Sequence, residues 1–120
     1  MDKLELNREC RRQRALERLG TNSPRCVVCG YDDPLALELH HVAGHDFGDE
    51  LAIVCRNHHR PLSDYQKDHP HQRDEKPNQI ERTVHFVEGL ADLFELLVKW
   101  LRDHATKLLA TTQTSPTTKG

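Results

Sequence analysis

The chain has 120 residues and a formal charge of −2, which allows one domain with a modest core. Residues 1–25 hold seven Lys and Arg against four Asp and Glu, giving +3, whereas residues 26–65 hold two against seven, giving −5. Net charge therefore does not predict nucleic-acid binding, although the basic front segment can still contact it. The acidic middle segment holds most of the cysteine and histidine and suits cations better than phosphate.

The sequence predicts neither secretion nor insertion into a membrane. MDKLELNRECRRQR contains no apolar stretch of the kind that a signal peptide has. The longest apolar run near the carboxyl terminus, Leu96-Leu97-Val98, is too short to span a bilayer. We therefore expect a cytoplasmic protein, in which clustered cysteines and histidines indicate metal binding before disulfides.

Two strands flanked by helices are predicted for the first two thirds of the chain. Residues 3–19 have a helical pattern that Gly20 ends, with Cys10 as a small core residue. Pro61 must lie in the first turns of the next helix or break it. His69 and His71, in the polar stretch that follows, are expected to be solvated. A knuckle with two cysteines is predicted at residues 25–34, and the two strands at residues 35–42 and 51–55. The second helix follows at residues 56–67 and the polar stretch at residues 68–78.

A long helix from Ile80 to about Leu109 is predicted, because 15 of the 26 residues from Val84 to Leu109 are apolar. Its polar residues form one narrow stripe with spacings of four, three, four and three, at Glu88, Asp92, Glu95, Lys99 and Arg102. Such a helix must pack on the rest of the domain, on another chain, or on both. We favour a homo-oligomer, because the other residues offer little apolar surface to cover the helix.

This order of elements predicts the α+β class. We expect a basic helix at residues 1–22, a zinc-stabilised core at residues 23–68 and a polar linker at residues 69–79. An amphipathic helix is expected at residues 80–110 and a disordered tail at residues 111–120.

Two pairs of soft or borderline ligands predict a structural zinc site. Cys26 and Cys29 lie on the knuckle, and Cys55 and His58 lie at the start of the second helix. Together they form a Cys3His set, which is a tetrahedral donor set that Zn²⁺ prefers. The gap between the two pairs is long enough for a hairpin to fold back.

The four zinc ligands leave three nearby histidines unexplained, and the stretch ELHHVAG contains two of them, His40 and His41. The third, His59, is about 100° around the helix from His58, so it faces away from the zinc. Antiparallel pairing of the two strands would bring the histidine pair close to His59. A second site beside the zinc is therefore predicted, with His45 as a spare ligand or a simply exposed side chain.

The run CVVCG…LELHHVAG…ELAIVCRNHHRPLSD, about residues 25–67, resembles the HNH endonuclease family, a zinc-containing ββα-metal fold. The resemblance implies hydrolysis of phosphodiester bonds in DNA, with His41 as the general base. It implies that His40 and His59 hold a catalytic divalent metal such as Mn²⁺, Ni²⁺, Mg²⁺ or Zn²⁺. His58 stands where the family usually has a fourth zinc cysteine.

One position departs from the family pattern. The family has a central Asn that ties down the loop facing the base, and this chain has Glu50 there. The Glu50 carboxylate could accept a similar bond or approach the metal, but it cannot donate as an amide does. Four arginines could contact DNA phosphates or simply form solvated helix faces, namely Arg56, Arg60, Arg11 and Arg12.

Three functions are compatible with these residues. The first is the metal-dependent endonuclease. The second is a catalytically inactive, zinc-stabilised module that binds nucleic acid or protein, which Glu50 favours. The third is an oligomeric scaffold organised by the long helix, which is compatible with either of the others.

Overall fold

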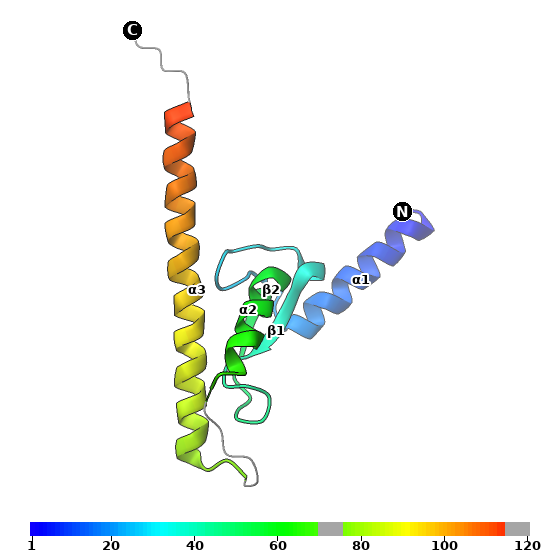
Figure 1. Ribbon diagram of the computed structural model, residues 1–120. Coiled ribbons are helices and arrows are strands. Elements are labelled where there is room, and N and C mark those ends of the chain that lie inside the picture. Colours follow the sequence, from blue (N-terminus) through cyan, green and yellow to red (C-terminus); the bar gives the residue numbers. More distant parts are fainter. Residues whose placement is uncertain (70–75, 115–120) are drawn as a thin grey trace.

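The computed structural model describes residues 1–69 and 76–114 of the chain. Its elements are, in order, helix α1 (Lys3–Leu19), the 3-10 turn η1 (Pro34–Ala36), strands β1 (Leu37–His41) and β2 (Leu51–Cys55), helix α2 (Arg56–Gln66) and helix α3 (Gln79–Thr114). The α+β class is confirmed. The hairpin and α2 form the centre, α1 points away from it, and α3 runs alongside (Figure 1).

Helix α1 is held by strong caps but contacts the domain only through its last turns. The Asp2 carboxylate accepts the Glu5 N–H at 2.8 Å, and Gly20 ends the helix in the left-handed region at φ 78°. Ala15 and Leu19 are buried, whereas residues 1–14 are exposed. The prediction that Cys10 lies in the core is therefore wrong, because the part of α1 that carries Cys10 projects away from the domain (Figure 1).

The two strands pair antiparallel, from Leu37 opposite Cys55 to His41 opposite Leu51. The first strand begins later than predicted, because Asp33 caps a 3-10 turn that starts at Pro34. Helix α2 follows β2 without a loop and continues through Pro61. The core between these elements is small and consists mainly of Leu19, Cys26, Val28, Leu37, Val54, Cys55, Leu62 and Leu96.

Helix α3 has 36 residues, so it is about 54 Å long and extends beyond the core at both ends (Figure 1). It ends at Thr114, so residues 111–114 of the predicted disordered tail are helical. The rest of that tail, and His71 in the linker, lie outside the described residues. Within the part of the chain that the structure describes, no helix is long and apolar enough to cross a membrane.

Histidine 69 corrects a second expectation. Its side chain is buried, and its Nε2 lies 2.8 Å from Asp92 Oδ2 on α3. The prediction that His69 is solvated is wrong, because α3 returns over the end of α2 and covers it. Close by, the buried ring of His85 stacks on Phe47 at a centroid distance of 3.5 Å, which joins α3 to the loop between the strands.

The closest approach of α3 to the hairpin is at Gly89. A Cβ atom at this position would lie 1.7 Å from the carbonyl oxygen of Val42, far inside van der Waals contact. Glycine is therefore required here by the packing of the helix against backbone, although glycine in a helix interior costs about 1 kcal/mol relative to alanine.

We predict that Gly89→Ala destabilises the protein by about 1–3 kcal/mol, the usual cost of overpacking, despite the better helix propensity of alanine. Urea unfolding followed by circular dichroism measures this change. Thr106→Ala, at an exposed position of the same helix, is the control and should change stability by less than about 0.5 kcal/mol. Equal stability of the two variants would contradict the close packing at Gly89.

Candidate metal centre

The first pair of metal ligands lies on a tight knuckle. The Gly30 N–H donates to the Cys26 carbonyl at 2.8 Å, and the Cys26 N–H donates to the Tyr31 carbonyl at 2.9 Å. Gly30 has a φ of 77°, which a residue with a side chain rarely adopts. The Val27 N–H donates to Ile53 of β2, so the knuckle is fixed against the strand that carries Cys55.

The second pair comes from the junction of β2 and α2. Cys55 is the last residue of the strand and His58 lies in the first turn of the helix. The ligand atoms of all four residues lie within 4.8 Å of one another. Cys29 Sγ is 3.9 Å from Cys55 Sγ, and Cys26 Sγ is 3.7 Å from His58 Nδ1. A zinc tetrahedron with Zn–S bonds of about 2.3 Å has S–S edges of about 3.8 Å, so the four donors fit a zinc ion.

The ionisation of these groups also favours a cation. Burial opposes ionisation of Cys26, but backbone hydrogen bonds from residues 28, 29 and 55 outweigh it and lower the pKa of its thiol. Burial, together with the neighbouring Cys26, raises the pKa of Cys29 to about 11. Burial also lowers the pKa of His58, which keeps its imidazole neutral as a metal ligand must be. A dication would relieve the repulsion between the thiolates.

The structure brings together two of the three remaining histidines. The rings of His40, on β1, and His59, on α2, meet edge to face with their centroids 5.3 Å apart. His40 is only 2% exposed, and burial together with the proximity of His59 and His41 lowers its pKa to about 4. His40 is therefore a neutral imidazole near neutral pH, which can bind a metal.

Glu38 is a member of this cluster that the sequence analysis missed. Its Oε1 lies 2.9 Å from His59 Nδ1, which leaves the other ring nitrogen of His59 for a ligand. Carboxylates commonly orient metal-binding histidines in this way. Residues two apart on a strand share a face, so the ELH sequence already places Glu38 beside His40.

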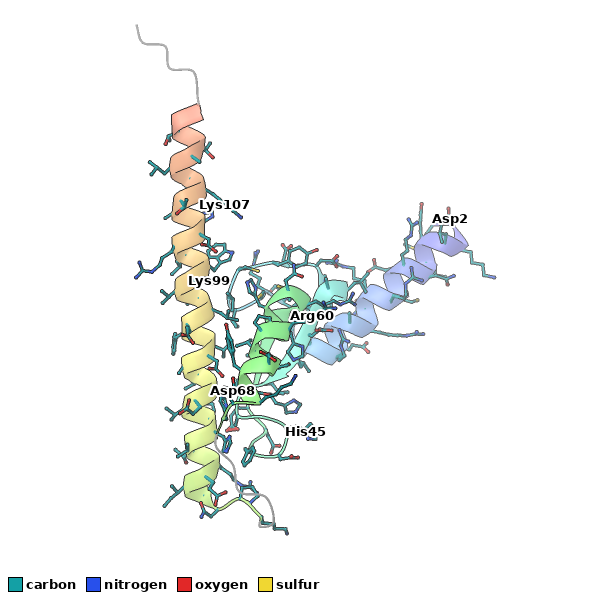
Figure 2. All side chains as sticks on the ribbon, viewed as in Figure 1. Asp2, His45, Arg60, Asp68, Lys99 and Lys107 are labelled. Atoms are coloured by element: carbon teal, nitrogen blue, oxygen red, sulfur yellow. The ribbon has the colours of Figure 1, made fainter. Side chains whose placement is uncertain are left out.

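His41 lies in a different environment from His40. Adjacent side chains of a strand leave it on opposite faces, and the His41 ring contacts His45 at a centroid distance of 4.9 Å. His45 is exposed, in line with one of the two readings of its sequence context, and projects from the loop between the strands (Figure 2). The Gln66 amide donates to the His41 carbonyl at 2.7 Å and fixes the end of β1 to α2.

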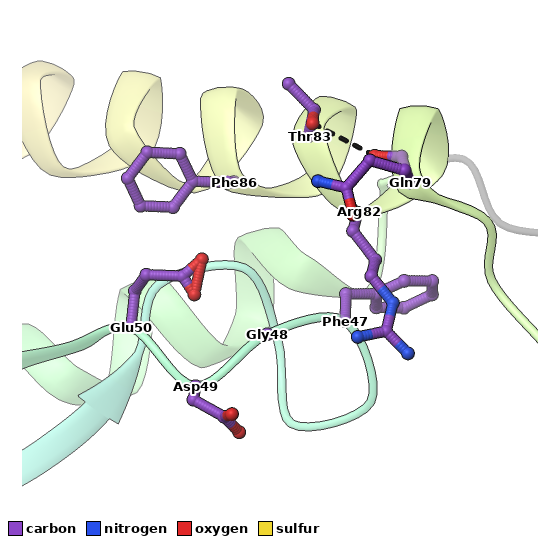
Figure 3. Close-up of a pocket in the computed structure, with 8 residues that line it drawn as sticks. All are labelled: Phe47, Gly48, Asp49, Glu50, Gln79, Arg82, Thr83 and Phe86. Atoms are coloured by element: carbon purple, nitrogen blue, oxygen red, sulfur yellow. Dashed lines mark hydrogen bonds between the residues drawn. The ribbon is translucent and has the colours of Figure 1, made fainter.

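Glu50 lies on the side of the interstrand loop that faces α3. Its carbonyl accepts the Val42 N–H at 3.0 Å, which extends the hairpin by one residue pair. Its carboxylate lies over Gly48 and points toward α3, in a hollow that Phe47, Arg82 and Phe86 also line (Figure 3). Among the described residues, the Cys3His set is the only group of three or more donors within reach of one ion, so a metal-binding role for Glu50 stays a prediction.

One of the predicted DNA-binding arginines, Arg56, lies beside the Glu38 carboxylate that contacts His59. Arg56 donates to the Leu35 carbonyl at 3.3 Å and its Nε lies 3.7 Å from Glu38 Oε2, while its side chain remains mostly exposed. Leu35 also lines a shallow hollow on α1, together with Arg11, Arg14 and Arg18. Arg60 and Arg12 are exposed as well. Basic side chains of α1 and α2 thus meet at the η1 turn, close to Glu38 and His59.

Comparisons with protein-family models, curated proteins and solved structures find no match to the chain. The resemblance to the HNH family therefore stays a prediction from the sequence. The four-ligand metal cluster stands independently on its geometry.

We predict about one tightly bound zinc per chain, and that Cys29→Ser abolishes both the zinc and the folded core. The reason is that zinc-binding free energy, roughly 10–16 kcal/mol in small zinc-dependent folds, is largely folding free energy when the core is small. Metal analysis of purified protein and circular dichroism before and after chelation measure the two effects.

Cys10→Ser is the matched control, because Cys10 is exposed and lies on α1 away from the cluster. It should retain the zinc and the fold. A wild-type protein that stays folded without metal would contradict the structural role of the cluster.

Proposed function

We propose that the chain is a metal-dependent endonuclease of the HNH kind, with a ββα-metal core, that hydrolyses phosphodiester bonds in DNA. The observation that carries the proposal is the contact between His40 and His59, beside Glu38 and on the same hairpin and helix as the Cys3His cluster. A zinc-stabilised fold needs only the four cluster ligands, so this second group of imidazoles calls for a separate role.

The proposed division of roles follows the chemistry of the side chains. His40 and His59 would hold a divalent ion, and Glu38 would fix the ring of His59 through Nδ1. The ion would supply positive charge to the scissile phosphate and the leaving oxygen. His41 would accept the proton of the attacking water, for which its side chain must turn from His45 toward the His40 side of β1. An imidazole accepts a proton well near neutral pH.

Access to the proposed site is from the α2 side. His40 is buried, whereas the side chains of His59 and Glu38 are 27% and 39% exposed. Two imidazoles favour Mn²⁺, Ni²⁺ or Zn²⁺, and oxygens of substrate and water allow Mg²⁺. The basic side chains around the η1 turn, which include Arg56 and Arg11, would contact the flanking phosphates of DNA.

Glu50 supports the inactive zinc-stabilised module as the second candidate. Its carboxylate faces α3, so it does not supply the amide contact that the family resemblance would assign to this position (Figure 3). Such a module would bind nucleic acid or protein through the same surface without cutting. The test below separates the two candidates.

We predict that zinc-loaded protein nicks supercoiled plasmid DNA when Mn²⁺, Ni²⁺ or Mg²⁺ is added. His41→Ala should lower the rate by roughly 10²–10⁴, the usual contribution of a general base. Gel quantification of nicked and linear plasmid against time measures the rate. His59→Ala should shift the metal concentration needed for half-maximal rate, since it removes a ligand.

His104→Gln, an exposed histidine on α3, is the matched control and should cut at the wild-type rate. A protein that binds plasmid in a gel-shift assay but cuts with none of the metals would support the inactive module. Cutting that is equally fast in His41→Ala would contradict the proposed base.

A further inference from the structure

Helix α3 carries an apolar stripe that the domain leaves uncovered. Nine apolar residues recur at alternating spacings of four and three along the helix, and all nine are exposed. They are Ile80, Val84, Val87, Ala91, Phe94, Val98, Leu101, Ala105 and Leu108. We name this set the seam. Alternation of four and three is the heptad period of a coiled coil, in which these residues occupy the a and d positions.

The seam lies on the side of α3 away from the packing contact at Gly89, and Phe94, at the edge of the seam, also lines a groove against the hairpin. At 100° per residue, two positions nine apart face opposite ways, so Val98 points away from the side on which Gly89 contacts Val42. The residues of α3 that are buried in the domain, His85, Gly89 and Leu96, belong to that other side. Side chains project from the free side of α3 along its length (Figure 2).

The part of α3 beyond the core has the least support from the domain. Residues 101–112 are all exposed, and Leu101, Leu108 and Leu109 are each more than half exposed. A helix gains most of its stability in proteins from packing one face against a partner. This end of α3 therefore needs a partner with a matching apolar helix.

We propose that the seam binds the seam of a second copy of this chain as an antiparallel coiled coil. A helical partner with the same 3.5-residue period is required, because only that period keeps the contact facing the partner over four heptads. The chain itself supplies such a helix. A twofold pair also places each domain on the outer side of its own α3, so the two domains do not obstruct the contact.

The flanks of the seam determine the antiparallel direction. One flank is mainly apolar and consists of Thr83, Leu90, Leu97 and His104. The other is mainly charged and consists of Glu81, Glu88, Glu95, Arg102 and Leu109. Parallel helices would place the apolar flank of one copy against the charged flank of the other. Antiparallel helices place like flanks together, so leucine can meet leucine and carboxylates can meet arginine.

One antiparallel register fits the charges and the length of the seam. With Val98 opposite Phe94 of the second copy, each Val84 lies opposite a Leu108, so eight of the nine seam residues pair with one another. This register brings Glu88 near Arg102 of the second copy, and the twofold axis repeats the pair. These two attractive pairs lie on either side of Glu95, which faces Glu95 of the second copy at the exposed edge of the contact. Leu97 then faces Leu97 of the second copy, next to the apolar groove that Val27, Leu51 and Phe94 line.

We predict that zinc-loaded wild-type protein sediments as a dimer, at twice its chain mass of 13.9 kDa, at micromolar concentration. Leu101→Glu should raise the dissociation constant at least ten-fold, because two buried carboxylates would lie in the seam. Thr106→Glu adds the same charge to the same helix off the seam and should remain dimeric. Sedimentation equilibrium without DNA measures these constants, independently of any nuclease activity.

The Leu101 side chain is exposed, so its substitution should leave the zinc content and the unfolding midpoint of the monomer unchanged. That check separates lost association from lost folding. A wild-type protein that is still monomeric at about 200 µM would overturn the proposal. Equal dissociation of the Leu101→Glu and Thr106→Glu proteins would overturn the role of the seam.

Cysteine cross-linking tests the direction in a Cys10→Ser background. In the antiparallel register, Phe94→Cys combined with Val98→Cys should form disulfide-linked dimers, because each new cysteine faces the other one in the second copy. Neither substitution alone should form such dimers, because the same residue in the two copies is separated by about four residues along the helix axis. Efficient cross-linking by Val98→Cys alone would indicate a parallel pair and overturn the antiparallel assignment.

Discussion

The crowding of three sulfur atoms and one imidazole within a few ångströms is the constraint on which the rest of the core depends. Burial, together with the neighbouring Cys26, raises the pKa of Cys29 to about 11, so a second thiolate beside the first is unfavourable without a cation. A bound dication would stabilise both thiolates and fix the knuckle to the β2–α2 junction. Since the apolar core contains few residues, a metal bound at this centre would help to fix the angle at which α2 leaves the hairpin.

The same constraint positions the histidine pair. His58 and His59 are consecutive in the first turn of α2, so fixing one toward the metal fixes the direction of the other. His59 then faces β1, where the hairpin register places Glu38 and His40 on one side of the strand. The cluster and the histidine pair are therefore geometrically coupled, and disturbance of the first will displace the second.

The sequence was sufficient for features that depend on local patterns. The end of α1 at Gly20, the second strand, the start of α2 and the four cluster ligands follow from residue types and spacings within short windows. Features that depend on distant packing were missed. Cys10 has a helical context, but only the direction of α1 shows that it is exposed. His69 has a polar context, but Asp92, far along the chain, covers it.

The amphipathic character of α3 illustrates why periodicity needs coordinates for its interpretation. Its 36 residues contain apolar positions on two opposite sides, so the single polar stripe at Glu88, Asp92 and Glu95 does not reveal which apolar side the domain uses. Gly89 resolves the question, since only a residue without Cβ can lie against the Val42 carbonyl. The domain therefore uses the Gly89 side. The longer and more regular apolar stripe, the seam, lies on the other side, where we propose that a second helix binds.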